Sequence, residues 1–280
     1  MKELPISIQE KLERYQPIKK GGYTLYPVRV ADYRRFSVAR PALEFAQQSL
    51  PVALLSVPLL DAFYKLELQN HSENREPSGF FASAVTALEL ALRLGDGEEA
   101  DGGEEIRALP IPGKTNDTLK EILFLRGQEQ IASVTPQKFQ SLRPIIAAQN
   151  GIQIPDEEAN PEILEMERLM EQNERANLEP KMWEKIVYVS QGSGIQEEEI
   201  YDWPLLKLER HAAILQRTTD YLAAQLAALS GMVKFKDGNP VPSPYFGRQK
   251  SGLRSLRDLQ SPESGVDAAA RDHQDTQSKE

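Results

Sequence analysis

The tripeptide Gly113-Lys114-Thr115 has the residues that end a phosphate-binding loop, in which backbone amides and a lysine hold nucleotide phosphates. The complete loop also has a glycine five positions before its second glycine, and here that position holds Ala108. Pro110 and Pro112 lack the amide hydrogens that such a loop would offer to phosphate. The pattern therefore favours a turn within a β segment over a nucleotide site.

The three histidines, His71, His211 and His273, are the other candidates for acid–base or metal chemistry. His211 lies in a region expected to be helical, but no His or Asp stands four residues away to complete a metal pair. The chain has no cysteine, which excludes disulfides, thiolate metal sites and cysteine nucleophiles. We therefore expect no metal, no other cofactor and no enzyme activity; an enzyme with an unrecognised site is an alternative.

Composition and charge limit the partners of the chain. Its 280 residues carry a formal net charge of -9, which argues against binding nucleic acid, where phosphate contacts need a basic face. The N-terminus has no apolar stretch of the signal-peptide type, and no run approaches the length of a membrane span. We expect a cytosolic protein that binds neither nucleic acid nor membrane.

The first third of the chain reads as an extended arm followed by helices. Tyr23–Val30 is rich in aromatic and β-branched residues and predicts a strand or extended arm. Asp32 predicts a helix start, and helical stretches follow to about Gln69. We expect breaks in these stretches at Pro41, Pro51 and Pro58, and a further helix over 80–94.

An acidic, glycine-rich stretch over 95–105 predicts an exposed loop. The only clear β pattern follows it, and predicts strands over 106–110, 122–126 and 130–134. Thr135 and Pro136 then predict a helix start, with Thr as the N-cap and Pro in the first helical position; this helix is expected to end near Asn150.

The rest of the chain predicts helices over 161–177, from 180 to the glycine turn at 192–194, over 196–201, and over 204–230. The last of these has apolar or small residues on alternating three- and four-residue steps, which are the a and d positions of a helix that packs along another helix. They are Leu205, Leu208, Ala212, Leu215, Thr219, Leu222, Leu226 and Leu229. The stripe is consistent with a bundle inside the chain or with a contact to another protein.

These elements predict an α+β fold, mainly α-helical, with a small antiparallel β element and a disordered C-terminal tail. We expect four regions: an arm with helices (1–94), the acidic loop with the β element (95–135), a helical region (136–247) and the tail (248–280). The helical core is expected over 30–94 and 136–230.

Three stretches resemble proteins of the tail module of tailed bacteriophages and prophages of Gram-positive bacteria. They are Leu25–Tyr33 with Phe36, Ala148–Asn150 followed by Ile154–Glu158, and Glu199–Pro204, which precedes the long helix and residues 230–235. The likeness follows the order of segments from residue 23 to about 246. Trp203-Pro204 departs from the more ordinary helix start expected at that place.

Some of these phage proteins resemble tail assembly chaperones, which bind the tape-measure protein before the tail tube forms. The resemblance thus implies a non-enzymatic phage morphogenesis factor in the cytoplasm of the bacterial host. The alternative is a structural component of the tail or neck, found in the virion. On the stripe and the aromatic segment beyond it, we expect Leu215, Leu222, Tyr245 and Phe246 to contact the partner. The alternative for Tyr245 and Phe246 is that they close the end of the chain's own helical core.

Overall fold

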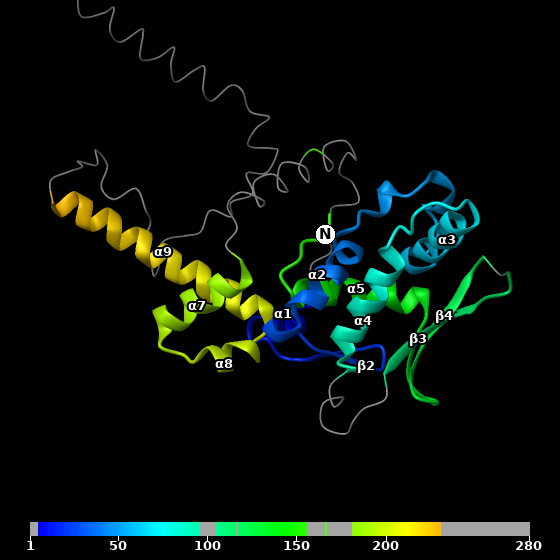
Figure 1. Cartoon of the computed structure of the whole chain (residues 1–280), viewed down its shortest axis with the longest axis horizontal. Coiled ribbons are helices and arrows are strands. Elements are labelled where there is room, and N and C mark those ends of the chain that lie inside the picture. The colour runs from blue at the N-terminus through cyan, green and yellow to red at the C-terminus, as the bar shows by residue number, and fades with distance from the viewer. Residues whose placement is uncertain (1–4, 96–104, 116, 156–165, 167–180, 231–280) are drawn as a thin grey trace, which may run out of the picture. The chain divides into compact units, whose positions relative to one another are not determined.

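The computed structural model of the chain describes residues 5–95, 105–115, 117–155, 166 and 181–230 (Figure 1). Over these ranges helices predominate and two small antiparallel sheets accompany them, which confirms the mainly helical α+β fold. The predicted tail (248–280) lies outside the described residues, as does the predicted acidic helix except for Met166. The chain divides into two compact units, 1–213 and 214–280, with the boundary inside the last helix.

Several helices begin or end at a proline or a glycine. The helices in the first hundred residues are α1 (Ile6–Glu13), α2 (Tyr33–Glu44), α3 (Leu59–Ser72) and α4 (Phe80–Leu92). Single 3-10 turns occupy Val30–Asp32, Gln47–Ser49 and Val52–Leu54. The later helices are α5 (Pro136–Gln149), α7 (Met182–Ser193), α8 (Glu197–Tyr201) and α9 (Leu205–Leu229).

Pro41 lies inside α2, so the helix break predicted at this residue is wrong. A proline inside a helix removes one backbone hydrogen bond and crowds the preceding turn. Phe36 and Leu43 are buried on either side of Pro41, and their burial offsets that loss. The breaks predicted at Pro51 and Pro58 are confirmed, because each proline directly precedes a new helical segment.

A short hairpin near the N-terminus joins β1 (Ile18–Lys20) to β2 (Tyr23–Leu25). Its turn consists of Gly21 and Gly22, whose φ angles of +57° and +90° suit glycine because it has no Cβ. The segment predicted over 23–30 is thus a strand only in its first three residues. The sequence did not reveal β1, since three residues are too few to show an alternating pattern.

The second sheet has the strand order β3-β4-β5 and is antiparallel throughout. Its strands are β3 (Ile106–Pro112), β4 (Leu119–Arg126) and β5 (Glu129–Val134), which confirms the three predicted strands with small extensions. The predicted start of α5 is also confirmed, because the Thr135 hydroxyl accepts a hydrogen bond from the amide of Lys138 at 3.3 Å.

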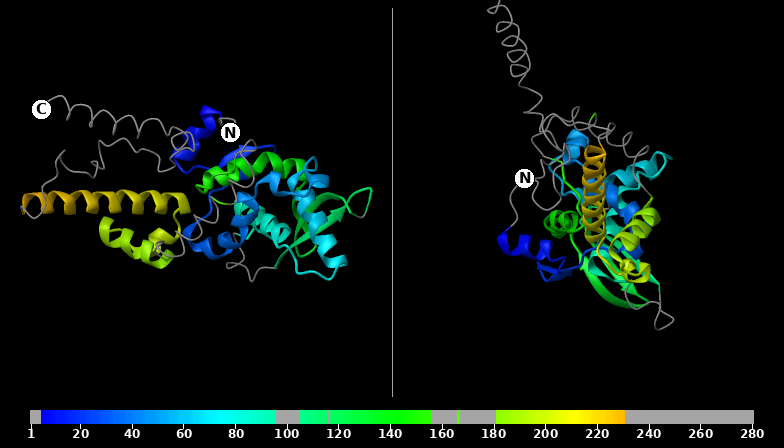
Figure 2. Two further views of the ribbon diagram at one scale, coloured as in Figure 1. Left: turned by 90° about the horizontal axis from the view of Figure 1, so that it is seen from above. Right: turned by 90° about the vertical axis from the view of Figure 1, so that its left-hand side faces the viewer.

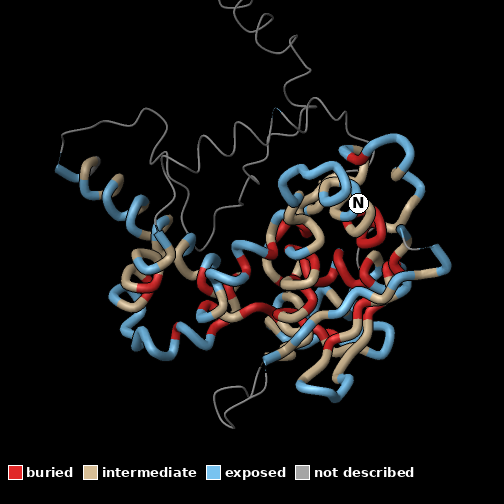
Figure 3. Tube along the Cα trace, turned by 45° about the vertical axis from the view of Figure 1, so that its right-hand side comes forward, coloured by how far each residue is buried: buried red, intermediate tan, exposed pale blue. Residues whose placement is uncertain are grey.

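The core of the first unit lies between this sheet and helices α2 to α5. Figures 1 and 2 show the strands beside α3 and α5, and β4 contacts both helices. Ile122 and Phe124 on β4 are fully buried, as are Phe63 on α3 and Phe139 on α5. Figure 3 shows the same concentration of buried residues where these elements meet.

Two contacts close the helical side of this core. The rings of Phe45, Phe63 and Phe80 form a cluster with centroids 4.7 to 5.4 Å apart. Nearby, the buried guanidinium of Arg143 donates hydrogen bonds to the backbone oxygens of Leu43, at 2.9 Å, and Phe45. These oxygens lie at the C-terminal end of α2, where a positive charge is favoured by the helix dipole.

Candidate functional site

The residues predicted to bind a partner are only partly within the described chain. Leu215 and Leu222 lie on α9, whereas Tyr245 and Phe246 lie outside the described residues. Leu215 is half-buried and the side chain of Leu222 is 54% exposed. The helix predicted over 204–230 begins and ends within one residue of α9.

The a/d stripe of α9 has a buried part and an exposed part. Leu205 and Leu208 are buried, with exposures of 4% and 0%, and belong to the first unit. Leu222, Leu226 and Leu229 are 54%, 67% and 81% exposed (Figure 3). The core was predicted to continue to residue 230, but among the described residues of α9 the last buried one is Leu208. We refer to residues 214–229 as the exposed stripe.

The exposed stripe carries few polar groups that would oppose a contact with another helix. Arg217 and Asp220 are its only charged residues, and both lie off the a and d positions. Asp220 accepts a hydrogen bond from Gln216 at 2.8 Å, and the Thr219 hydroxyl donates to the Leu215 carbonyl at 3.0 Å. Gln216, Thr219 and Asp220 therefore find hydrogen-bond partners within the helix.

Ile214, which is 49% exposed, was not selected from the sequence because it lies outside the a/d pattern. Leu226 and Leu229 are in the pattern but were not named as contact residues. The spacing already contained them, so the missing information was their exposure. Only the packing around a helix determines that quantity.

The start of α9 is fixed by hydrogen bonds to residues far away in the sequence. The amide of Leu205 donates to the Val28 oxygen at 2.9 Å, and the amide of Val30 donates to the Trp203 oxygen at 2.8 Å. The side-chain oxygen of Asn150 accepts from the amide of Val28 at 2.9 Å. We call this group of residues the central junction.

The central junction brings together three segments that are far apart in the sequence, around residues 28–30, 150 and 203–205. Val28 and Val30 are buried, and so are Trp203 and Leu205. Pro204 and Arg29 form an isolated antiparallel β-bridge through their backbones. The unusual Trp-Pro pair is therefore a packing element that directs the chain into α9. These segments therefore hold the start of α9 against the rest of the first unit.

His211 lies half-buried on α9. Its Nδ1 atom is 2.9 Å from the oxygen of Lys207, and its ring lies 4.9 Å from that of Trp203. The Lys207 ammonium is 3.5 Å from the centre of the Trp203 ring. Burial lowers the pKa of Lys207, and the charge of Glu199 opposes this shift. The arrangement is a packed cation–π contact.

Gly113-Lys114-Thr115 lies in the connection between β3 and β4, as the sequence indicated. The Gly113 amide donates to the Thr118 oxygen at 2.7 Å and so closes a turn. A Cβ at position 113 would lie 2.5 Å from the Thr118 hydroxyl oxygen, which explains the glycine. The amide that a phosphate would need is thus already bonded within the turn.

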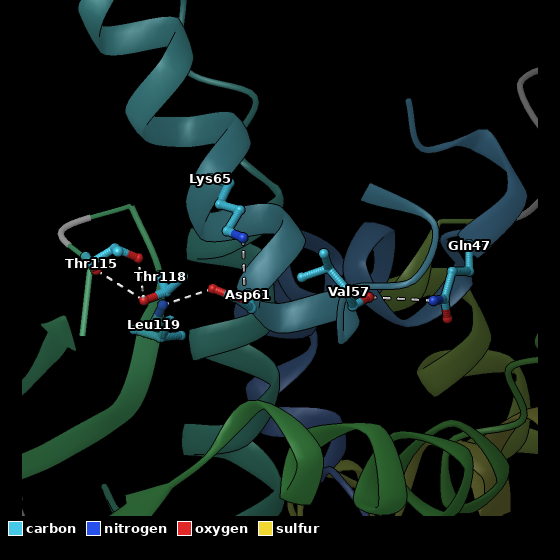
Figure 4. A network of polar contacts seen from close by, with 7 residues as sticks. All are labelled: Gln47, Val57, Asp61, Lys65, Thr115, Thr118 and Leu119. Carbon is cyan, nitrogen blue, oxygen red and sulfur yellow. Dashed lines mark hydrogen bonds and ion pairs between the residues drawn. The ribbon is translucent and has the colours of Figure 1, made fainter. Parts of the chain in front are cut away.

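The turn is anchored to α3 by Asp61 (Figure 4). One carboxylate oxygen of Asp61 accepts a hydrogen bond from the Leu119 amide at 2.7 Å, and the other lies 3.7 Å from the Lys65 ammonium. Asp61 is buried, so these partners are needed to offset its lost hydration. The carboxylate is therefore a structural link between helix and sheet.

A hollow of about 300 Å³ opens beside the N-terminus of α3, lined by Gln47, Ser56, Val57, Pro58, Gln137 and Gln140. The Gln47 amide nitrogen donates to the Leu55 oxygen at 3.0 Å and to the Val57 oxygen at 3.4 Å, the second of which Figure 4 shows. The Gln140 nitrogen donates to the Gln47 oxygen at 3.0 Å. The Gln140 oxygen accepts from the Leu59 amide at 3.1 Å. Both amides brace the loop that follows α2.

Other kinds of site were sought over the same ranges. Within the described ranges, no three His, Asp or Glu side chains gather closely enough to hold a metal ion. No helix in this part of the chain is long and apolar enough to cross a membrane. The exposed stripe of α9 is therefore the best candidate for a functional surface. Comparison with protein-family models, curated proteins and solved structures gave no match.

Proposed function

We propose that the protein is a non-enzymatic binding protein that presents the exposed stripe of α9 to a helix of another protein. The observation that carries the proposal is the exposure of Leu222, Leu226 and Leu229 at successive a and d positions. An apolar stripe of this spacing fits the groove between side chains of a second helix. Covering it removes apolar surface from water, which stabilises the complex by roughly 25 cal/mol for each Å² buried.

The resemblance to phage tail proteins supplies the identity of the partner. On this basis the protein is a tail assembly chaperone, and the exposed stripe binds the tape-measure protein in the cytoplasm of the bacterial host. The tape-measure protein is expected to be long and helical, so it offers the kind of surface that an a/d stripe recognises. Binding needs neither nucleotide nor metal, since recognition rests on apolar burial.

Co-expression with the candidate tape-measure protein, followed by pull-down with a chelator present, tests the proposal. We expect co-purification of the unmodified protein and its loss in the variant Leu222→Glu/Leu226→Glu. Both leucines are exposed, so the charges should leave the fold intact. Arg217→Gln is the matched control, because Arg217 lies on the same helix but off its a and d positions. Failure of the unmodified pair to co-purify would reject the proposal.

The alternative, a structural component of the tail or neck, differs in where the protein ends up. A chaperone leaves the tail once the tube has formed, whereas a structural component stays in the virion. Mass spectrometry of purified particles separates the two. We expect peptides of this chain to be absent from particles and present in lysates of infected cells. Stoichiometric amounts in particles would support the structural role instead.

A further inference from the structure

The charge of the residues beside the exposed stripe indicates which kind of helix can pair with it. In coiled coils, charged residues at the e and g positions beside the stripe commonly form salt bridges that set partner choice and orientation. Within the exposed stripe these positions hold Gln216, Thr218, Ala223 and Gln225, all of them neutral. A helix with neutral flanks and leucines at the same spacing would meet no charge repulsion, and α9 of another copy is such a helix.

The order of large and small residues along the stripe favours one orientation of two such helices. In a parallel pair, Thr219 would face Thr219 of the second copy and leave a layer of two threonines between leucines. In an antiparallel pair, each a position faces a d position of the other helix. Thr219 then faces Leu222 of the second copy, and Leu215 faces Leu226, so that every small residue meets a leucine. Antiparallel helices also align their dipoles favourably.

We infer that α9 pairs with α9 of a second copy of this chain in an antiparallel coiled coil. The inference rests on the proposed function, because it gives the same stripe an occupant before the tape-measure helix binds. Self-pairing covers Leu222, Leu226 and Leu229 in the free protein, and the partner helix then replaces the second copy. The two-fold symmetry makes the contact close on itself, which limits assembly to a dimer.

The contact covers the exposed stripe only, which is little more than two heptads. An interface this short is at the weak end of the range for specific protein contacts. We therefore expect a dimer that dissociates on dilution, as exchange with another helix requires.

Sedimentation velocity of the full chain over a wide concentration range tests the pairing. The expected result is a monomer–dimer equilibrium for the unmodified protein and for Arg217→Gln. In Leu222→Glu the dimer dissociation constant should rise by about tenfold or more, since each introduced charge would be buried against Thr219 of the second copy, and the two charges would lie in neighbouring layers near the symmetry axis. A monomer at every concentration overturns the inference, and so does a dimer that Leu222→Glu leaves unchanged.

The lack of cysteine makes the orientation testable by single-thiol variants. Thr219→Cys and Leu222→Cys are mixed and oxidised, and each is also oxidised alone. A disulfide needs the two Cα atoms within about 7 Å. The antiparallel pair predicts a strong cross-link in the mixture and little in Thr219→Cys alone. A strong cross-link in Thr219→Cys alone would show parallel helices and overturn the orientation.

Sedimentation uses the protein alone, so its outcome is separate from that of the tape-measure pull-down. A monomeric protein that co-purifies with the tape-measure protein would reject self-pairing and leave the proposed function standing. A dimer that fails to co-purify would do the reverse. If both hold, adding the tape-measure protein should lower the dimer fraction, and a dimer fraction that stays constant would contradict the shared use of the stripe.

Discussion

The side-chain oxygen of Asn150 accepts a 2.9 Å hydrogen bond from the backbone amide of Val28, although 122 positions separate the two residues. Asn150 directly follows α5, and its side-chain nitrogen donates to the Ile146 oxygen at 2.8 Å. The end of α5 is thereby tied to the segment that contains Val28. The backbone oxygen of Val28 in turn accepts a hydrogen bond from the amide of Leu205. One amide side chain thus links α5 to the start of α9.

Replacing Asn150 by alanine should lower the free energy of unfolding by about 1–3 kcal/mol, because the buried amide of Val28 would lose its acceptor. Denaturant unfolding gives this value, and hydrogen exchange at Val28 should become faster in the variant. Asn70→Ala, on the half-buried end of α3, is the control and should change stability by no more than about 0.5 kcal/mol. Equal effects of the two variants would contradict a structural role for the Asn150 bond.

Asp61 and Lys65 should differ sharply in their effect on stability. Asp61→Ala leaves the Leu119 amide without its buried acceptor and should cost about 1–3 kcal/mol. Lys65→Ala removes a partly exposed ion pair with a 3.7 Å separation and should cost less than about 1 kcal/mol. Thermal or urea unfolding of both variants measures which one loses more stability. A larger loss in Lys65→Ala would contradict the view that the hydrogen bond from Leu119 is the more stabilising of the two Asp61 contacts.

Leu208 and Leu222 occupy equivalent d positions of α9 but differ in burial. Leu208→Ala should destabilise the protein by about 2–5 kcal/mol, because the side chain is fully buried. Leu222→Ala should change the stability of the first unit little and should instead weaken binding to a helical partner. Urea unfolding and pull-down, applied to both variants, measure the two effects. A large loss of stability in Leu222→Ala at low protein concentration would show that the chain itself buries this residue.

The Asp117 carboxylate should titrate below its usual pKa of 3.8, chiefly because it accepts a hydrogen bond from the Thr115 side chain. A lowered pKa in the folded state means that the contribution to stability is present above 3.8 and is lost as the pH falls through the lowered value. Thr115→Val should raise the pKa of Asp117, as measured by carbon-detected NMR titration. Lys65→Met should change it less, since the charge of Lys65 is the smallest of the causes.

Local signals in the sequence were sufficient for most of the fold. Thr135-Pro136 marked the start of α5, and the alternating residues over 106–134 marked the strands, because capping and strand patterns depend on near neighbours. The helix break predicted at Pro41 was wrong because that prediction rested on a local effect alone. The local effect of Pro41 disfavours a helix, but the burial of Phe36 and Leu43 by distant segments stabilises one.

The candidate site shows the same division. The sequence by itself determined that residues 205–229 form a helix with an a/d stripe, since the spacing of side chains follows from helix geometry. It could not distinguish Leu208 from Leu222, which occupy the same position in the repeat. The tertiary structure decided that one is buried and the other exposed. Burial depends on which distant residues pack against each turn of the helix, and helix spacing carries no information about them.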